Sequence, residues 1–372
     1  MKHSIIYKNK DRYASFPLLE KMEDQIRIGF FTAPVPDHMG IFNWNVFESF
    51  NNGETWTVKS TYDKHSISPR EMSDRFVCKI DNIEIITGSY GFKIINENQS
   101  LPGFELYPHP IYKIHKSKSL FYRRSSDNWH SASQRFYEIP GADIVLTFPR
   151  AIHIRDYLIL VPAYALFPQY DMSRCFVWRS EDAGKTFNLW NMFPGEVDGN
   201  EMAFVLTEKG ILAHIRSDKH PYLMESWSYD SGITWTYPTN VYFENGNQRG
   251  NIIGGPPHLL RLKDNKILCT YGYRRNKMGI RAIISVDEGY SWSEPIVLRD
   301  DGGYRSNLHK RKLRNKFKLA SPANDIGYPV SIQLFDKSIL TTYYITNADQ
   351  ITHIAATKWE IEAFFDLQKI NL

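Results

Sequence analysis

The sequence predicts an all-β fold, a six-bladed β-propeller that spans residues 1–372 as a single domain. Three observations predict it: a turn motif in four copies, an apolar hairpin pattern in six copies, and the absence of a sustained helical period. Supersecondary units that recur along a chain are the signature of a repeat architecture. Because a propeller arranges four-stranded sheets around a central channel, it accommodates both repeats.

The turn motif, an Asp-box, has the pattern Ser-x-Asp-x-Gly-x-Thr-Trp. The Asp or Asn side chain bonds nearby backbone groups, and Gly takes the positive φ that closes a hairpin. The aromatic residue anchors the turn in apolar packing. The copies are Ser49-Phe-Asn-Asn-Gly-Glu-Thr-Trp56, Ser180-Glu-Asp-Ala-Gly-Lys-Thr-Phe187, Ser228-Tyr-Asp-Ser-Gly-Ile-Thr-Trp235 and Ser285-Val-Asp-Glu-Gly-Tyr-Ser-Trp292, with a degenerate fifth in Ser125-Ser-Asp-Asn-Trp129. We interpret these turns as structural, so they indicate the scaffold and not the chemistry.

The hairpin pattern is an apolar strand, a polar turn and a second apolar strand. Its copies are residues 16–28, 74–86, 148–160, 201–212, 256–268 and 328–340. Four of them are followed by an Asp-box, which would close the second hairpin of a four-stranded blade. The last segment, through residues 352–359, is expected to pair with the N-terminal strand 4–7, which closes the ring and removes free sheet edges.

Composition and charge narrow the function classes. The chain is 42% hydrophobic and rich in aromatic residues, with 22 Tyr, 22 Phe and 9 Trp, which favours strands. A net charge of +4 does not indicate a nucleic-acid-binding protein, which needs a concentrated basic face. A polar insert at residues 304–324 is interpreted as a solvated loop or, alternatively, as a basic flap that attracts an anionic substrate.

Neither a metal, a cofactor nor a membrane span is expected. Cys78, Cys175 and Cys269 lie in apolar runs and are interpreted as reduced core residues. The Cys and His spacing is not that of a zinc site, and no EF-hand-like calcium loop is present. No run approaches the ~18 apolar residues of a transmembrane helix. The start of the chain lacks the apolar stretch of a signal peptide, which predicts a cytoplasmic protein, or a secreted or periplasmic one if an export signal has been removed.

Candidate site residues come from the geometry of a propeller, in which the inner strands begin around one end of the axis. Asp74, Glu201 and Tyr328 begin such strands. His258 follows two prolines at the start of another. Arginines in or near the first or second strands of blades three to five are Arg150, Arg216, Arg274 and Arg281. The structural alternatives are aromatic packing for the tyrosine and ordinary surface ion pairs for the charged residues.

On these repeats and positions, nearly the whole chain resembles the sialidase (neuraminidase) family, whose propellers carry BNR or Asp-box repeats. The resemblance implies a Tyr nucleophile paired with a Glu, an Asp acid/base, and three arginines that clamp the carboxylate of the sugar. Tyr328, in Gly-Tyr-Pro, matches the place of the nucleophile. Glu201 matches the glutamate that activates it, and Asp74 matches the acid/base.

The arginines match less completely. Arg216 follows Glu201 at the family's spacing, and Arg281, with Arg274 as its rival, matches the arginine that precedes an Asp-box. The family's first arginine lies in an Arg-Ile-Pro sequence, and this chain has Ser15-Phe16-Pro17 there. Arg12 stands three residues upstream. Because the first arginine of the clamp is missing from its usual position, the resemblance does not imply specificity for N-acetylneuraminic acid itself.

The chemistry explains these residue types. A sialic-type sugar carries a carboxylate on its anomeric carbon, which would repel a carboxylate nucleophile, and a neutral Tyr avoids that repulsion. Guanidinium groups grip carboxylates bidentately and keep their charge. The sequence therefore predicts a retaining exo-glycosidase that removes a terminal acidic sugar, sialic or a related nonulosonic acid, from a glycan. The alternatives are a propeller hydrolase or lyase for another acidic polysaccharide, and a non-catalytic glycan-binding propeller.

Overall fold

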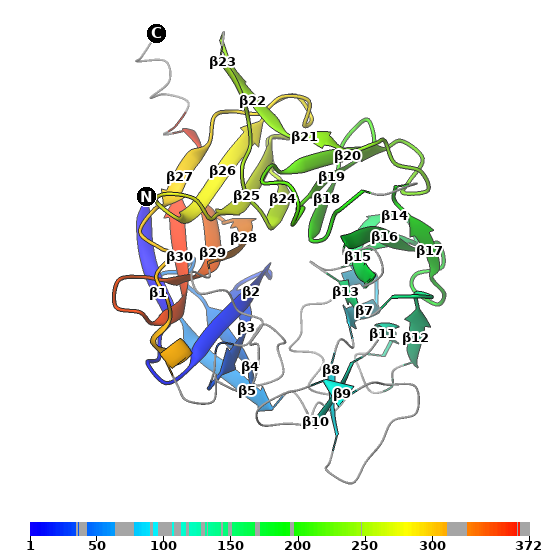
Figure 1. Ribbon diagram of the computed structural model, residues 1–372, viewed down its shortest axis with the longest axis horizontal. Helices are drawn as coiled ribbons and strands as arrows, with labels where there is room; N and C mark the ends of the chain where they lie inside the picture. The colour runs from blue at the N-terminus through cyan, green and yellow to red at the C-terminus, as the bar shows by residue number, and fades with distance from the viewer. Residues whose placement is uncertain are drawn as a thin grey trace. The chain divides into compact units, whose positions relative to one another are not determined.

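The computed structural model describes most of the chain. The described residues are 1–34, 36, 43–63, 78–89, 92–95, 106–107, 113–116, 119–127, 131, 133–142, 144–147, 151–167, 172–193, 197–246, 248–310, 326–362 and 364. They fall into two compact units, the first drawn from residues 1–64, 242–314 and 319–372 and the second from 65–241 and 315–318. The regular structure in both is almost entirely antiparallel strand (Figure 1). Among the described residues, no helix has the length and apolarity needed to cross a membrane.

The first unit contains three four-stranded sheets. One consists of β2 (Tyr13–Lys21), β3 (Ile26–Ala33), β4 (Asn43–Ser49) and β5 (Thr57–Asp63). The next consists of β24 (Pro257–Arg261), β25 (Ile267–Tyr273), β26 (Gly279–Ser285) and β27 (Ile296–Arg299). The third is ordered β1 (Lys2–Tyr7), β30 (Thr352–Trp359), β29 (Ile339–Thr346) and β28 (Gly327–Gln333). A hairpin of β22 (Tyr242–Asn245) and β23 (Gln248–Asn251) and the 3₁₀ helix η3 (Asn307–Lys310) complete the unit.

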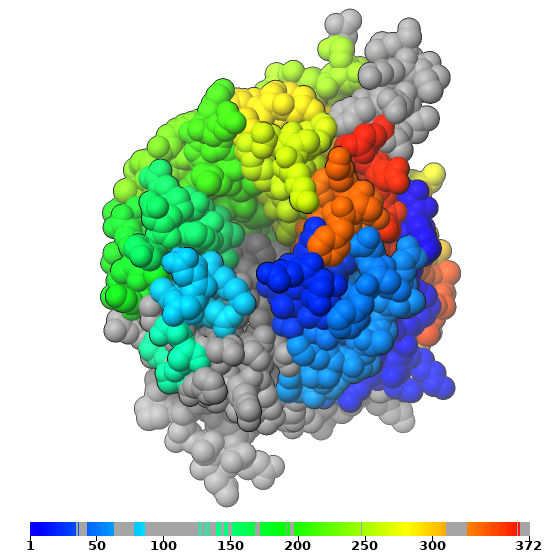
Figure 2. All heavy atoms as spheres, turned by 180° about the vertical axis from the view of Figure 1, so that it is seen from behind, coloured from blue at the N-terminus to red at the C-terminus, as the bar shows by residue number. Residues whose placement is uncertain are grey.

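The first and last strands of the chain share a sheet, as predicted. β1 runs antiparallel to β30, with Ser4 opposite Ala356 and Ile5 opposite Ala355. Figure 1 shows β1 in blue beside β30 in red, and the space-filling view in Figure 2 shows blue N-terminal residues against orange C-terminal ones. The outer edge of β30 is therefore paired by the N-terminal strand and not left open.

The second unit also contains three sheets of four or five strands. The first is β6 (Cys78–Ile80), β7 (Ile83–Ser89), β11 (Ser119–Ser125) and β12 (Ser133–Glu138). The next is β15 (Leu158–Phe167), β16 (Met172–Ser180) and β17 (Asn188–Asn191), with β13 (Ile144–Thr147) and β14 (Ile152–Arg155) both paired to β15. The last is β18 (Met202–Leu206), β19 (Ile211–Ile215), β20 (Met224–Ser228) and β21 (Thr239–Asn240). A smaller sheet holds β8 (Phe92–Ile95), β9 (Leu106–Tyr107) and β10 (Lys113–Lys116).

All six predicted hairpins are present. They are β2–β3, β6–β7, β14–β15, β18–β19, β24–β25 and β28–β29, each antiparallel. Each Asp-box then joins the last two strands of a sheet: β4 to β5, β16 to β17, β20 to β21 and β26 to β27. The sequence pattern therefore located both halves of these sheets.

The Asp-box turns are held by side-chain hydrogen bonds. In the second box, Ser180 Oγ donates to Asp182 Oδ1 (2.8 Å), and Asp182 accepts from Thr186 N (2.9 Å) and Thr186 Oγ1 (2.6 Å). Asp230 and Asp287 accept the corresponding bonds in the third and fourth boxes. In the first box Asn51 replaces the Asp: its Oδ1 accepts from Thr55 N (2.9 Å), and its Nδ2 donates to Thr55 Oγ1 (2.8 Å). The degenerate turn between β11 and β12 keeps two such bonds, from Ser131 to Asp127.

The glycine of each turn serves both the local bend and the packing of sheets. Ala183 and Gly184 both have positive φ, +55° and +76°, the left-handed region that glycine adopts readily. A β-carbon built on Gly184 would lie 2.5 Å from Ile85 Cδ1, and one on Gly232 would lie 2.8 Å from Leu160 Cδ1. The turn at the outer end of one sheet is thus pressed against the second strand of the preceding sheet in the chain.

Both faces of a sheet are buried. Along β15, Ile159, Val161 and Ala163 belong to one apolar cluster, whereas the intervening Leu160 belongs to another. Successive side chains of a strand point to opposite faces, so the two clusters lie on opposite sides of the sheet. Cys78, Cys175 and Cys269 are buried and unbridged, which confirms the prediction of reduced core thiols.

The aspartate at the centre of an Asp-box should contribute more to the free energy of unfolding than its solvent exposure suggests. Asp182→Ala is expected to lower the free energy of unfolding by about 1–3 kcal/mol, because the buried Ser180 hydroxyl and the turn N–H lose their acceptor. Asp182→Asn should cost less than about 1 kcal/mol, because Asn51 makes the corresponding bonds in the first turn. Urea denaturation at pH 7 measures both, and equal losses would contradict the hydrogen-bond account.

The same aspartate should make stability depend on pH. Burial opposes ionisation of Asp182, but the hydrogen bonds from Thr186 and Ser180 outweigh it and lower its pKa below the ordinary value. A lowered folded-state pKa stabilises the fold above the unfolded value of about 3.9, and this contribution is lost as pH falls through the folded pKa. The free energy of unfolding of the wild type should therefore fall more steeply than that of Asp182→Asn between about pH 4 and pH 2. Parallel curves would show that Asp182 does not titrate in this way.

Candidate functional site

Tyr328 lies at a distorted position of β28. Its φ is +53°, which is unusual for a bulky side chain, and the pairing of β28 with β29 breaks register between Gly327 and Val330. Phe16 repeats this geometry in β2, with φ of +53° and a register break between Ser15 and Leu18. Such backbone strain costs about 1–3 kcal/mol and gathers at functional sites, so Tyr328 is a candidate for one.

Aromatic packing fixes the Tyr328 ring within the first unit. The ring stacks on Tyr344 at 5.8 Å between centroids and meets the edge of Phe16 at 4.6 Å and 89°. Tyr328 is only 7% exposed. The irregular backbone and the two aromatic neighbours together position the ring of a largely buried residue.

Arg274 lies beside the backbone that leads into Tyr328. Its Nε donates to the Ile326 carbonyl (3.1 Å), and a β-carbon built on Gly327 would lie 3.9 Å from one of its terminal nitrogens. His258, on β24, also approaches β28, where its Nδ1 accepts from Ser331 N (3.4 Å). An acceptor Nδ1 places the ring proton of a neutral imidazole on Nε2. Of the residues predicted for the site, the structure brings Arg274 and His258 to the strand that carries Tyr328.

Arg281 has a different environment from its rival Arg274. Its guanidinium donates to the carbonyls of Lys277 (3.0 Å), Ile280 (3.2 Å) and Arg299, and lies over the Tyr273 ring at 4.7 Å. Arg281 is 7% exposed, and burial lowers its pKa. These backbone contacts favour a structural role, in which the arginine ties β26 to β27.

Arg12 lies in the turn between β1 and β2. Its N–H donates to the Asn9 carbonyl (3.3 Å). Its charge acts against the effect of burial, which raises the pKa of Tyr7. Asp74 and Arg150 lie outside the described residues, so their predicted roles stay predictions. Both interpretations of the insert at 304–324 also stay predictions, because its residues 311–324 are not described.

Glu201 and Arg216 form a cross-strand pair in the second unit, at the open end of the β18–β19 hairpin. Arg216 Nη1 lies 2.5 Å from Glu201 Oε2, and Arg216 Nη2 lies 2.6 Å from Asp218 Oδ1. The Glu201 side chain is 6% exposed, that of Arg216 22% and that of Asp218 55%. A buried carboxylate is thus joined through one arginine to an outer carboxylate at the surface.

Two neighbours of this pair were not found from the sequence. Asn200 Nδ2 donates to Asp218 Oδ2 (2.8 Å). Asp198 accepts from Ser217 Oγ (2.6 Å) and from the N–H groups of Asp218 (3.0 Å) and Lys219, and these bonds outweigh burial and lower its pKa. Asp198 therefore holds the turn that presents Asp218. The segment Val-Asp-Gly-Asn-Glu at 197–201 is visibly polar in the sequence, but only the fold shows which groups its side chains bond.

Tyr164, on β15, is a third residue that was not found from the sequence. Burial raises its pKa well above the ordinary value, the charge of Glu201 raises it further, and Arg216 acts in the opposite direction. The phenol is therefore neutral at physiological pH. Within the described part of the chain, no group of three or more His, Cys, Asp or Glu side chains is arranged to hold a metal ion.

Comparison with known families decides the relationship that the repeats suggested. The family described as BNR repeat-like domain matches residues 112–341. The chain belongs to the BNR repeat-like domain family. Its fold is accordingly an all-β propeller with BNR repeats. A comparison with curated proteins by sequence found no match.

Solved structures that resemble this BNR repeat-like domain in fold include sialidases. A protein of unknown function from Dyadobacter fermentans DSM 18053 is 23% identical, with a TM-score of 0.69, over 96% of this chain and 98% of that one. The Hadza microbial sialidase Hz136 is 14% identical, with a TM-score of 0.57, over 94% of this chain and 66% of that one. Trypanosoma rangeli sialidase, in complex with sialic acid, is 12% identical, with a TM-score of 0.59, over 96% and 56%. The chain thus spans 66% and 56% of these two sialidases, and the likeness is one of fold.

The environment of Arg281 gives a direct test of its role in this BNR repeat-like domain. Arg281→Met is expected to lower the free energy of unfolding by about 2–4 kcal/mol, because the carbonyls of Lys277 and Arg299 lose their donors. Arg249→Met, which changes a side chain that is 60% exposed on the β22–β23 hairpin, should stay within about 0.5 kcal/mol. Denaturant unfolding measures both. If Arg281→Met has wild-type stability, the structural role is wrong, and Arg281 is again a candidate ligand of the substrate.

Proposed function

We propose that this protein is a sialidase-like retaining exo-glycosidase that hydrolyses a terminal acidic sugar, sialic or a related nonulosonic acid, from glycans. In this proposal one six-bladed propeller domain, residues 1–372, carries the site. The observation that supports it most is Tyr328: a phenol on strained backbone, locked by two aromatic rings and flanked by Arg274. The buried Glu201–Arg216 pair supports it independently.

The proposed steps conserve atoms and charge. Tyr328 Oη attacks the anomeric carbon while the bond to the leaving oxygen breaks, and Glu201 accepts the phenolic proton. Asp74 gives its proton to the leaving oxygen, which leaves the sugar bound to Tyr328 Oη. In the second step Asp74 takes a proton from the water that attacks the anomeric carbon, the bond to Tyr328 Oη breaks, and Glu201 returns its proton to the phenol. A neutral phenol approaches an anomeric carbon that bears a carboxylate without the repulsion a carboxylate nucleophile would meet. Arg216 and Arg274 are the proposed ligands of the sugar carboxylate, with Arg150, His258 and Arg12 as further candidates.

Phe16 supports a second candidate function. Ser15 occupies the position of the sialidase family's Arg-Ile-Pro arginine, and the adjacent Phe16 presents an apolar ring to Tyr328 at 4.6 Å between ring centroids. A site without this arginine holds a carboxylate less tightly and offers an aromatic wall instead. This favours a different acidic sugar, as in a hydrolase or lyase for another acidic polysaccharide.

The nucleophile is tested with a fluorogenic sialoside. Tyr328→Phe removes only the hydroxyl and is expected to lower kcat by at least about 10³-fold. Glu201→Gln should lower it by about 10²–10⁴-fold, as expected for a lost general base. Tyr344→Phe is the matched control, since this ring stacks on Tyr328 but has no proposed chemical step. If Tyr328→Phe releases the fluorophore as fast as the wild type, Tyr328 is not the nucleophile. If the wild type cleaves no nonulosonic-acid glycoside, the proposed substrate class is wrong. Acidic polysaccharides would then be screened for new reducing ends or unsaturated products.

Asp218 should compete with the substrate for Arg216. Its carboxylate holds Arg216 Nη2 at 2.6 Å and is exposed, so a sugar carboxylate that binds this arginine has to displace it. Asp218→Asn removes the competing charge and is expected to lower KM for an anionic sugar by about 5–10-fold, equivalent to roughly 1 kcal/mol, with little change in kcat. Glu208→Gln, on the β18–β19 turn, is the control for loss of one negative charge. A rise in KM would instead make Asp218 a positioning residue for Arg216.

A further inference from the structure

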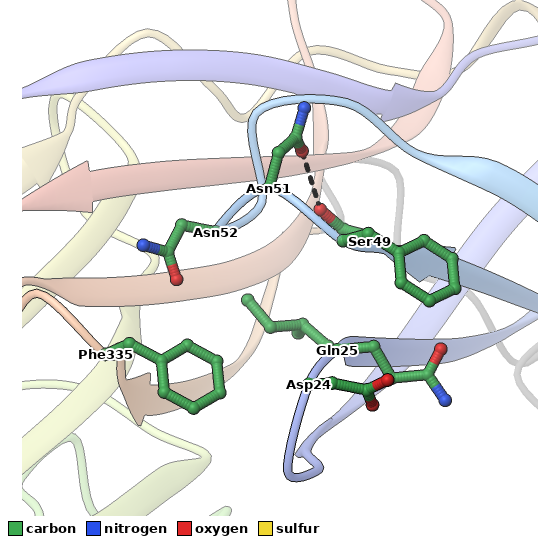
Figure 3. Close-up of a pocket in the computed structure, with 8 residues that line it drawn as sticks. Asp24, Gln25, Ser49, Asn51, Asn52 and Phe335 are labelled. Carbon is green, nitrogen blue, oxygen red and sulfur yellow. Dashed lines mark hydrogen bonds between the residues drawn. The ribbon is translucent and has the colours of Figure 1, made fainter.

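A pocket of about 350 Å³ lies in the first unit, where three turns meet. Asp24 and Gln25 come from the turn between β2 and β3, Asn51 and Asn52 from the first Asp-box, and Phe335 from the turn between β28 and β29. Figure 3 shows these side chains around the opening, with Asn52 above the Phe335 ring. None of the proposed catalytic residues lines it. Ligand pockets span about 300–1,000 Å³, so this one suits a single small ring.

Two hydrogen-bond acceptors at this pocket lack a partner. Gln25 Oε1 and Asn52 Oδ1 are both shielded from bulk solvent, and neither accepts a hydrogen bond from any described residue. Leaving a shielded acceptor unpaired costs free energy, and such groups are rare enough in native proteins that each needs a reason. A bound ligand with hydroxyl or N–H donors would supply the missing bonds. The Asp24 carboxylate adds a third acceptor at the same place.

Two aromatic rings complete the pocket. Phe50 is 65% exposed and Phe335 47% exposed, although large apolar side chains usually avoid such exposure. Lys21 Nζ lies 3.9 Å from the centroid of the Phe335 ring and also donates to the Gln333 carbonyl (3.2 Å). The ring is thereby held in place while nearly half of its surface stays open to a ligand.

We infer that this pocket binds one neutral sugar residue. A neutral pyranose has hydroxyl donors for the oxygens of Gln25, Asn52 and Asp24, and a face of C–H groups that packs on an aromatic ring. The Asp24 carboxylate and the Lys21 ammonium at the Phe335 ring offset each other, so the pocket offers no net positive charge for an acidic sugar, and the expected ligand differs from the one proposed for Tyr328. Such a site would hold the uncharged part of a glycan and does not depend on hydrolysis.

The test is a titration of the full-length chain with methyl glycosides, followed by ligand-observed NMR. The probes are the methyl glycosides of galactose, glucose and N-acetylglucosamine, with the methyl glycoside of N-acetylneuraminic acid and tetramethylammonium as comparators. A neutral sugar is expected to bind with a Kd of roughly 1 mM, typical of a single small subsite, and more tightly than either comparator. The same titration is repeated in Tyr328→Phe, in which turnover is excluded. The outcome for this pocket is therefore independent of whether the proposed hydrolase activity is correct.

Three variants assign the binding to this pocket. Phe335→Ala removes the stacking ring, and Asn52→Gly removes the amide at a residue whose φ of +56° glycine accepts. Each is expected to raise Kd at least tenfold. Gln25→Met removes an unpaired acceptor, so it should weaken binding without lowering the thermal midpoint, which a purely structural glutamine would not do. Tyr229→Ala changes the residue equivalent to Phe50 in the third Asp-box, also exposed (61%), and should leave Kd unchanged.

Other outcomes overturn the inference. No saturable binding of any neutral sugar, or equal binding in the wild type, Phe335→Ala and Asn52→Gly, would exclude this site. Tighter binding of tetramethylammonium would identify a cation site built from Asp24 and the two rings. Tighter binding of the sialoside that Phe335→Ala abolishes would replace a neutral ligand with an acidic one.

Discussion

The structure depends on the burial of each sheet on both of its faces. The residues of β15 alternate between two apolar clusters, so a sheet removed from its neighbours would expose apolar surface on both sides. This mutual dependence needs sheets that approach closely. Gly184 and Gly232 allow it, because a β-carbon at either position would collide with Ile85 or Leu160 of the preceding sheet. The Asp-box is therefore a local turn and, at the same time, a contact between sheets.

Close packing also determines where charge is tolerated. Glu201 and Arg216 adjoin the ends of β18 and β19, and Arg281 lies on β26. Each of the three has polar partners that compensate its charge, as charges removed from water require. Arg216 meets two carboxylates, of which only Glu201 is buried, so its outer side remains accessible to exchange. Arg281 meets backbone carbonyls and is enclosed. Arg216 and Arg281 were both predicted to bind the sugar carboxylate, but their environments differ. Arg216 is partly exposed beside carboxylates, whereas Arg281 is enclosed by carbonyls, so only the environment of Arg216 suits reversible binding of a ligand.

How far the sequence predicted the candidate site differs from residue to residue. The choice of Glu201 and Arg216 followed from their places at the two ends of a predicted hairpin. Their ion pair with each other was not predicted, and antiparallel register explains it, because it brings such positions together. The aromatic contacts of Tyr328 did not follow, since Phe16 and Tyr344 come from other strands and 22 tyrosines offered no means of choosing. Asp198 was missed because its partners come from two segments distant in sequence, Ser173 from one and Ser217 to Lys219 from the other.

The sequence alone determined the repeat, its hairpins, the Asp-box turns and the pairing of the chain's two ends. These depend on alternation and turn chemistry within about fifteen residues, or on an edge that has to be covered. Tertiary structure alone decided which charged groups are enclosed by carbonyls, which meet carboxylates, and which polar atoms line a pocket without partners. Those outcomes depend on the side-chain environment contributed by several turns and strands, and local sequence carries no record of that environment.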